Sequence, residues 1–97
     1  MKIADLPTPS VLVDRDILKK NITAYQSICS KNGKKMLPMA KTHKSSEVMR
    51  LQMEAGAWGI LAATIDEAEA ACRESCGRIC FAYPITAPQT LVRIRFL

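Results

Sequence analysis

The chain has 97 residues, which is enough for one small domain, and 48% of them are hydrophobic, which excludes a disordered tail or a low-complexity segment. The formal net charge is +5, yet only 5% of the residues are aromatic, so the sequence lacks the interleaved basic and aromatic side chains of a nucleic-acid surface. No apolar run approaches the roughly 20 residues that cross a bilayer, and the first residues lack the apolar core of a secretory signal. We therefore expect a cytoplasmic protein with neither a membrane nor a nucleic acid as partner.

The first predicted elements are a short β-prone run at residues 10–13 and a long helix after it. Prolines at positions 7 and 9 disfavour helix before the run, and Asp14 or Asp16 is suited to cap the helix that follows. The pair Asn32-Gly33 is a stop signal. The helix has an apolar stripe at helical spacing, which we interpret as core: Leu18, Ile22, Tyr25 and Cys29.

Three further apolar runs, at residues 36–40, 58–63 and 79–83, are predicted strands, although Pro38 inside the first cannot donate to a ladder. Helices are predicted at 46–55, from the capping box at Thr64 to about residue 74, and after Thr86, whereas 91–97 also alternates like a strand. This βα alternation predicts a parallel sheet with right-handed crossovers, in a barrel or a doubly wound fold. No glycine-rich phosphate loop follows the first strand, which argues against a dinucleotide-binding unit.

A closed eight-stranded βα barrel needs about 250 residues, so this chain supplies well under half of one. We therefore expect a fragment or a truncated reading frame. Such a chain would expose sheet edges and apolar faces, and would aggregate, oligomerise or stay partly unfolded.

The four cysteines are predicted to be buried structural thiols rather than metal ligands. Cys72, Cys76 and Cys80 are spaced by four and Cys29 is remote, which is a poor match to the paired spacing of zinc sites. We expect Cys72 and Cys76 on one helix face and Cys80 in the next strand. A metal site with His43 as fourth ligand is the alternative.

The candidate catalytic residue is Lys41, which stands where the strand at 36–40 ends, within the segment LPMAKTHK at residues 37–44. Strand ends are where α/β barrels assemble their active sites, and lysine forms Schiff bases with carbonyl cofactors. A charged side chain leaving a buried strand must be paired, neutralised or covalently used. The alternative is a solvated lysine at the start of a loop, which is the commoner case.

The motifs around Lys41 resemble a known enzyme family. The segments TPSVLVD (8–14), AKTHKS (40–45) and LQMEAGA (51–57) are similar to the D-threonine aldolase and D-serine dehydratase family, and the similarity continues through IDEAE (65–69) and FAYPI (81–85). Members of this family are fold-type III pyridoxal-phosphate (PLP) enzymes, related to the N-terminal barrel of alanine racemase.

The resemblance implies a fold and a domain assignment for residues 1–97. They would be the N-terminal part of a PLP-binding (β/α)8 barrel, with the first three or so βα units at 36–97. Residues 10–13 would instead pair with a C-terminal β-domain that the chain lacks.

The resemblance also implies the site. Lys41 would form the Schiff base with PLP, and His43 and Tyr83 are candidate cofactor-binding residues. The alternatives are that His43 is a hydrogen-bonded loop histidine and that Tyr83 only packs against its neighbours. No metal ligand is assigned here, although a divalent metal is possible in the full-length family. The substrate would be a small D-3-hydroxyamino acid, and the full-length enzyme a homodimer.

The sequence departs from the family pattern in one respect. Arginine and histidine commonly precede the lysine in the order Arg-Pro-His, whereas Leu37, Pro38 and Met39 stand here. This puts in doubt the hydrogen bonding that those groups provide to the cofactor ring. The function implied is a truncated PLP-dependent lyase that is inactive as an isolated chain. The alternatives are an alanine racemase-like or single-domain PLP-binding protein, or a non-catalytic βα remnant.

Overall fold

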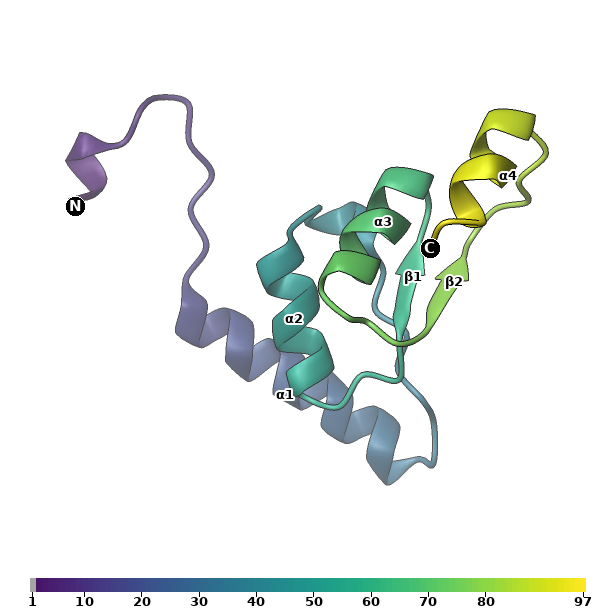
Figure 1. The fold of residues 1–97 in the computed structure, drawn as a ribbon. Coiled ribbons are helices and arrows are strands. Elements are labelled where there is room, and N and C mark those ends of the chain that lie inside the picture. The colour runs from purple at the N-terminus through teal and green to yellow at the C-terminus, as the bar shows by residue number, and fades with distance from the viewer. Residues whose placement is uncertain (1) are drawn as a thin grey trace.

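A small parallel sheet with helices against it forms the centre of the structure, a computed structural model that describes residues 2–97 (Figure 1). The elements, in chain order, are the 3-10 helix η1 (Ile3–Asp5), α1 (Arg15–Lys31), the 3-10 helix η2 (Ala40–Thr42), α2 (Ser46–Glu54), β1 (Ile60–Ala62), α3 (Ile65–Arg73), β2 (Ile79–Phe81) and α4 (Pro88–Ile94).

Strands β1 and β2 run parallel, and Leu61 of β1 lies opposite Cys80 of β2. Both predicted strands are confirmed, although each is shorter than its apolar run. The expected mixed α/β arrangement with parallel pairing is thereby also confirmed.

The predicted strand at 36–40 was too long. Its residues run beside β1, but they form only an isolated parallel bridge between Met39 and Leu61. The Leu61 N–H donates to the Pro38 carbonyl at 2.9 Å, so the proline takes part as an acceptor and needs no N–H. Ala40 already belongs to η2, because the chain turns away from the sheet there.

The long helix α1 begins and ends where the sequence predicts. Asp14 is its N-cap and accepts hydrogen bonds from the N–H groups of Asp16 and Ile17, and Gly33 follows the C-cap with a φ of +62°. The interpretation of Tyr25 as core was wrong, since this residue is 63% exposed, and Ile22 is the only residue of α1 that is buried. The reason is that α1 has its main packing contact with α2, so most of its surface faces solvent.

Helix α3 is capped by Thr64 as expected, and α2 has an N-cap at Ser45. Ser45 accepts a hydrogen bond from the Val48 N–H, and Thr64 accepts one from the Glu67 N–H. The Glu67 carboxylate completes the second cap by accepting from the Ala63 N–H at 2.8 Å.

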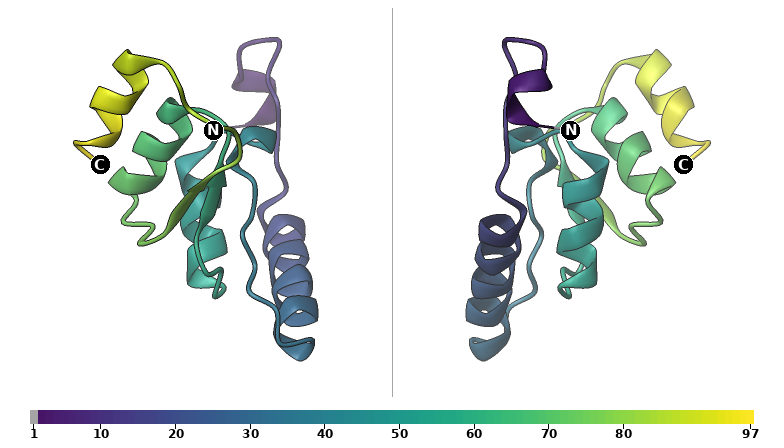
Figure 2. Two further views of the ribbon diagram at one scale, coloured as in Figure 1. Left: turned by 90° about the vertical axis from the view of Figure 1, so that its right-hand side faces the viewer. Right: turned by 90° about the vertical axis from the view of Figure 1, so that its left-hand side faces the viewer.

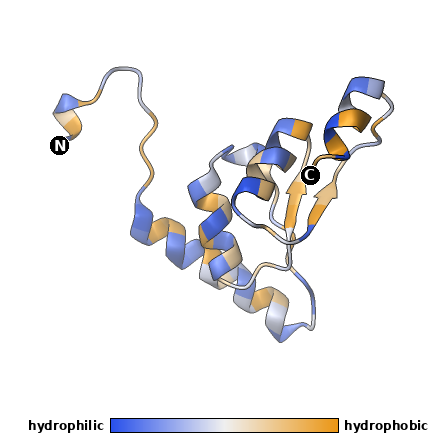
Figure 3. Cartoon of the chain, in the orientation of Figure 1, coloured by the Kyte–Doolittle hydropathy of each residue, from blue (hydrophilic) through white to orange (hydrophobic). Residues whose placement is uncertain are grey.

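The core lies between the sheet and these helices. Its buried residues are Ala40, Met49, Ile60, Ala71 and Cys76. Because side chains alternate along a strand, Met39, Leu61 and Cys80 lie on the other face, which no helix of the described chain covers. Both strands are hydrophobic throughout (Figure 3), as expected for a sheet meant to be covered on both faces.

The prediction of four buried thiols was therefore only partly right. Cys76 is buried, Cys29 and Cys72 are half-buried, and Cys80 is exposed on the uncovered face. Cys80 does lie in the predicted strand, but Cys76 follows the end of α3, so it does not share a helix face with Cys72.

Residues 7–14 form an arm that runs away from the body, and α4 lies at the opposite end of the molecule (Figures 1 and 2). The arm is extended but pairs with no strand in the part of the chain described, and Val11 is 94% exposed. Within residues 2–97, no helix is both long and apolar enough to span a membrane.

Helix α4 confirms the helical alternative for the segment that also alternates like a strand. Pro88 is its first residue, where a missing N–H costs nothing. Arg93 fixes α4 to α3 by ion pairs with Asp66 at 2.6 Å and Glu69 at 2.7 Å.

Candidate active site

The carboxyl ends of β1, β2 and the segment 36–39 meet at one edge of the sheet. A shallow hollow of about 350 Å³ opens there, between the ends of β1 and β2 and the start of α4. The residues that line this hollow include Phe81, Tyr83 and three threonines, so it combines two aromatic rings with the hydroxyl groups of Thr64, Thr86 and Thr90. Of the three sequence-predicted site residues, only Tyr83 lines the hollow.

Lys41 lies at the same edge, at the centre of η2. Its backbone is held firmly, because the Thr42 hydroxyl donates to the Met39 carbonyl at 3.0 Å and the Lys44 N–H donates to the Ala40 carbonyl at 2.9 Å. The preceding Ala40 is fully buried, whereas the Lys41 side chain is exposed and makes no ion pair within residues 2–97.

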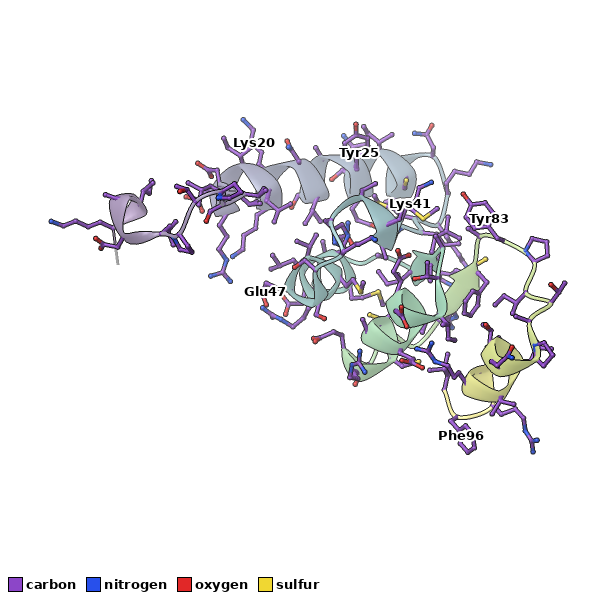
Figure 4. The ribbon with its side chains drawn as sticks, turned by 90° about the horizontal axis from the view of Figure 1, so that it is seen from above. Lys20, Tyr25, Lys41, Glu47, Tyr83 and Phe96 are labelled. Atoms are coloured by element: carbon purple, nitrogen blue, oxygen red, sulfur yellow. The ribbon has the colours of Figure 1, made fainter. Side chains whose placement is uncertain are left out.

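The exposure of Lys41 differs from the expectation of an amine enclosed in a cavity. The physical reason is that the elements around it cover only the side of η2 that carries Ala40. Figure 4 looks down on the strand ends and shows Lys41 and Tyr83 in the same region, with Glu47 further away on α2.

The side chain of His43 is half-buried in the structure. Its Nδ1 accepts a hydrogen bond from the Ser45 N–H at 3.1 Å, and its Nε2 is buried without a partner. Burial lowers the pKa of His43, and the Gln52 side chain and Glu67 carboxylate nearby work against that shift. The ring therefore packs down toward α2 and α3, not outward to the hollow.

Two polar residues beneath the loop were missed by the sequence reasoning. Gln52 has a buried Oε1 without a partner, and Glu67 is only 6% exposed although it carries a carboxylate. The capping box at Thr64 predicted Glu67 as a capping residue, but it did not indicate that Glu67 is buried. No sequence signal identifies Gln52, because a glutamine in a surface helix is ordinary.

No cluster of three or more histidine, cysteine, aspartate or glutamate side chains that could hold a metal ion occurs in the described part of the chain. The set that the sequence left open, Cys72, Cys76 and Cys80 with His43 as fourth ligand, is not brought together in the described residues.

We compared the chain with known proteins to find those that it resembles. No protein-family model matches it. D-threo-3-hydroxyaspartate dehydratase of Delftia sp. (strain HT23) is 39% identical over 64 residues, which are 66% of this chain and 17% of that enzyme. This chain is similar to part of that dehydratase. The resemblance predicted from its motifs is confirmed.

Solved structures agree with this relationship. The structure of the dehydratase from Delftia sp. HT23 superposes with a TM-score of 0.84 at 33% identity, over 95% of this chain and 25% of that one. A D-threonine aldolase from Filomicrobium marinum superposes with a TM-score of 0.88 at 23% identity, over 95% of this chain and 25% of that one, which shows a shared fold. The chain thus spans about a quarter of the length of these relatives.

Proposed function

We propose that this chain forms part of a PLP-dependent lyase that acts on D-3-hydroxyamino acids, with Lys41 as the residue that binds the cofactor covalently. The observation that carries the proposal is the place of Lys41, directly after a segment that runs parallel to β1, in a chain related to a D-threo-3-hydroxyaspartate dehydratase. The names of both relatives, a dehydratase and an aldolase, fit D-3-hydroxyamino acid substrates.

The residues of the site fit the cofactor. Lys41 presents an exposed amine with no ion pair in the described chain, so the amine is available to an aldehyde. Only the neutral amine attacks a carbonyl carbon, so Nζ must first give up its proton. PLP, when bound, supplies an electron sink for the bond that breaks.

The surroundings of Lys41 support specific roles for its neighbours. The hollow beside Tyr83, with three threonine hydroxyl groups, is suited to polar groups of the cofactor or substrate. We propose Tyr83 as a cofactor contact. The apolar pair Leu37 and Met39 offers no hydrogen bond to the cofactor ring, so we expect looser binding than in relatives with Arg-Pro-His.

We also propose that residues 36–97 are the first βα units of a (β/α)8 barrel. Three parallel segments, each followed by a helix, support this assignment, as does the uncovered face with Met39, Leu61 and Cys80, which the other strands would enclose. The exposed apolar run at 10–13 would then pair with a separate β-domain, and the complete enzyme would be a homodimer. A divalent metal would take its ligands from the three-quarters of the relatives that this chain does not cover.

The test of the proposal is reductive trapping. The chain is incubated with PLP, treated with borohydride, digested, and the modified peptides are identified by mass spectrometry. We expect the label at Lys41, with Lys41→Ala unlabelled and the matched control Lys44→Ala labelled normally. Equal labelling of several lysines, or labelling that survives in Lys41→Ala, would overturn the assignment.

One observation favours a second candidate, a non-catalytic βα module that binds a partner. The arm and the uncovered sheet face leave Val11, Val13 and Cys80 exposed. Size-exclusion chromatography discriminates between the two. A folded monomer that binds PLP supports the lyase assignment, whereas self-association without PLP binding supports the module.

A further inference from the structure

Two buried polar atoms without partners lie beneath the loop that carries Lys41. They are Nε2 of His43, in the loop itself, and Oε1 of Gln52, in the second turn of α2. The Gln52 side chain is close enough to the ring to influence its titration. Since buried polar groups are rarely left unpaired, these two atoms are natural partners for each other.

The hydrogen bonding of the other ring nitrogen fixes the proton of His43. Nδ1 accepts from the Ser45 N–H at 3.1 Å, so it carries no proton in the neutral ring. The proton of the neutral ring must then be on Nε2, which makes Nε2 a donor. An amide oxygen such as Gln52 Oε1 is the acceptor that this donor requires.

We propose that His43 is a positioning residue for Lys41, with Nδ1 holding the Ser45 N–H and Nε2–H donating to Gln52 Oε1, so that the ring ties the loop at 41–45 to α2. This inference rests on the proposed function of Lys41. It replaces the earlier expectation that His43 contacts the cofactor.

The ring holds the end of the loop to the start of α2. Ser45 is also the N-cap of α2, so the bond from its N–H to Nδ1 fixes the loop relative to the helix start. At the other end of the loop, the Lys44 N–H donates to the Ala40 carbonyl at 2.9 Å, and Lys44 adopts a φ of +48°, which non-glycine residues rarely do. Lys41 lies between these two anchors.

A proton on Nδ1 would break this arrangement, because two N–H donors would then face each other at Ser45. The charged group that acts on the ring from a packed element is Glu67 of α3. Lys41 and Lys44 are its neighbours along the loop, and Glu47 of α2 is exposed and paired with Arg50. Burial keeps the ring neutral by lowering the pKa of His43, and Glu67 opposes this only in part. The loop should therefore loosen under acidic conditions.

The pair can be tested without any cofactor, because His43 is the only histidine of the chain. Long-range proton–nitrogen NMR on the whole chain should show the tautomer with the proton on Nε2. Gln52→Leu should lower the titration midpoint of the ring, since the amide acceptor that favours its charged form is lost. Gln52→Glu keeps the size of the side chain and should raise the midpoint by about one pH unit or more.

The chain offers a matched control in Gln26, whose Oε1 is likewise buried and unpaired but lies on α1 beside Gly56. Gln26→Leu and Gln26→Glu should leave the titration of His43 unchanged. If Gln52→Leu does not fold, the upward shift of the His43 titration midpoint in Gln52→Glu tests the pair by itself.

The positioning role can be tested by measuring PLP labelling at Lys41 and at Lys44 over a range of pH and taking the ratio of the two. The effect of pH that is common to all amines largely cancels in this ratio. The ratio should fall several-fold as His43 becomes protonated, and its midpoint should move with that of His43 in the Gln52 variants. His43→Asn keeps an acceptor for the Ser45 N–H and cannot titrate, so it should hold the ratio constant.

The outcomes separate this inference from the proposed function. A proton on Nδ1, or a midpoint that responds equally to Gln26 and Gln52 variants, overturns the pair whatever Lys41 does. A labelling ratio that ignores the titration of His43 overturns the positioning role. Absence of labelling at Lys41 together with the predicted NMR shifts overturns the PLP assignment and leaves the His43–Gln52 pair standing.

Discussion

Replacing Gly59 with alanine tests how closely β1 and β2 approach where the sheet begins. A Cβ at this position would lie 2.4 Å from the Arg78 carbonyl oxygen and 2.8 Å from the Arg78 Cβ. Gly59 does not adopt a positive φ, so its role here is to leave room for the neighbouring backbone. The same Arg78 carbonyl accepts the hydrogen bond from the Ile60 N–H at 2.9 Å, so it cannot move without disturbing the sheet.

The size of the effect follows from this contact. The carbonyl must move by about 0.6 Å to reach 3.0 Å, below which Cβ contacts are essentially never observed. Overpacking of this kind costs about 1–3 kcal/mol, and loss of the Ile60 hydrogen bond adds about 1 kcal/mol. We expect Gly59→Ala to lower the free energy of unfolding by about 2–4 kcal/mol, a large part of the stability of a domain of this size.

The assay is urea unfolding followed by the fluorescence of Trp58, the only tryptophan of the chain and the neighbour of Gly59, together with circular dichroism. Gly77→Ala is the matched control, since no atom lies within 4 Å of its Cβ position. That control should be neutral or stabilising by about 0.4–1 kcal/mol, because alanine restricts the unfolded chain. Equal unfolding midpoints for the two variants would refute the argument from close approach.

Three other predictions concern the loop, α4 and the thiols. Because burial lowers the pKa of His43 below 6.5, the unfolded chain takes up this proton first as the pH falls. The free energy of unfolding should therefore be highest above pH 6.5 and decline as the pH falls through the folded-state pKa of His43. Urea unfolding between pH 7.5 and 5.5 can measure this decline. Arg93→Ala removes both ion pairs to α3, so limited proteolysis should cut within α4 faster while the global unfolding midpoint changes little. Ellman's reagent should modify exposed Cys80 rapidly and Cys76 slowly, because burial shields Cys76 and raises the pKa of its thiol.

Each of these three predictions has a control variant or condition that tests its stated cause. His43→Asn should flatten the pH dependence above pH 5.5, and a slope that persists in that variant would assign the effect to another group. Added salt should mimic Arg93→Ala, and insensitivity of α4 to both would show that other contacts hold it. Cys80→Ser should remove the rapid thiol, and a fast phase that remains would contradict the exposure of Cys80.

Local sequence signals located most of the elements. Asp14, Ser45 and Thr64 lie at helix starts because a short oxygen-bearing side chain satisfies free N–H groups wherever a helix begins. Asn32-Gly33 and Gly56 end helices through the left-handed conformations that the chain requires there. The motif around Lys41 also identified the relatives, since residue types in a fixed order carry that information without any coordinates.

Contacts between distant segments could not be obtained in this way. Tyr25 has the spacing of a core residue, yet it is exposed because α1 has its main packing contact with α2 and leaves this side to solvent. Cys80 lies in an apolar strand, but its side of the sheet remains uncovered. Glu67 and Gln52 are common helix residues whose burial depends on how α2 and α3 pack beneath the loop.

The sequence by itself determined the alternation of two parallel strands with helices, the caps at Asp14 and Thr64, and Lys41 as the candidate lysine, because all of these depend on neighbours along the chain. The tertiary structure decided that Lys41 faces outward while His43 faces inward toward Gln52. That difference arises because η2 turns the chain at the sheet edge, and only the packing of α2 and α3 against that turn selects which side chains are buried.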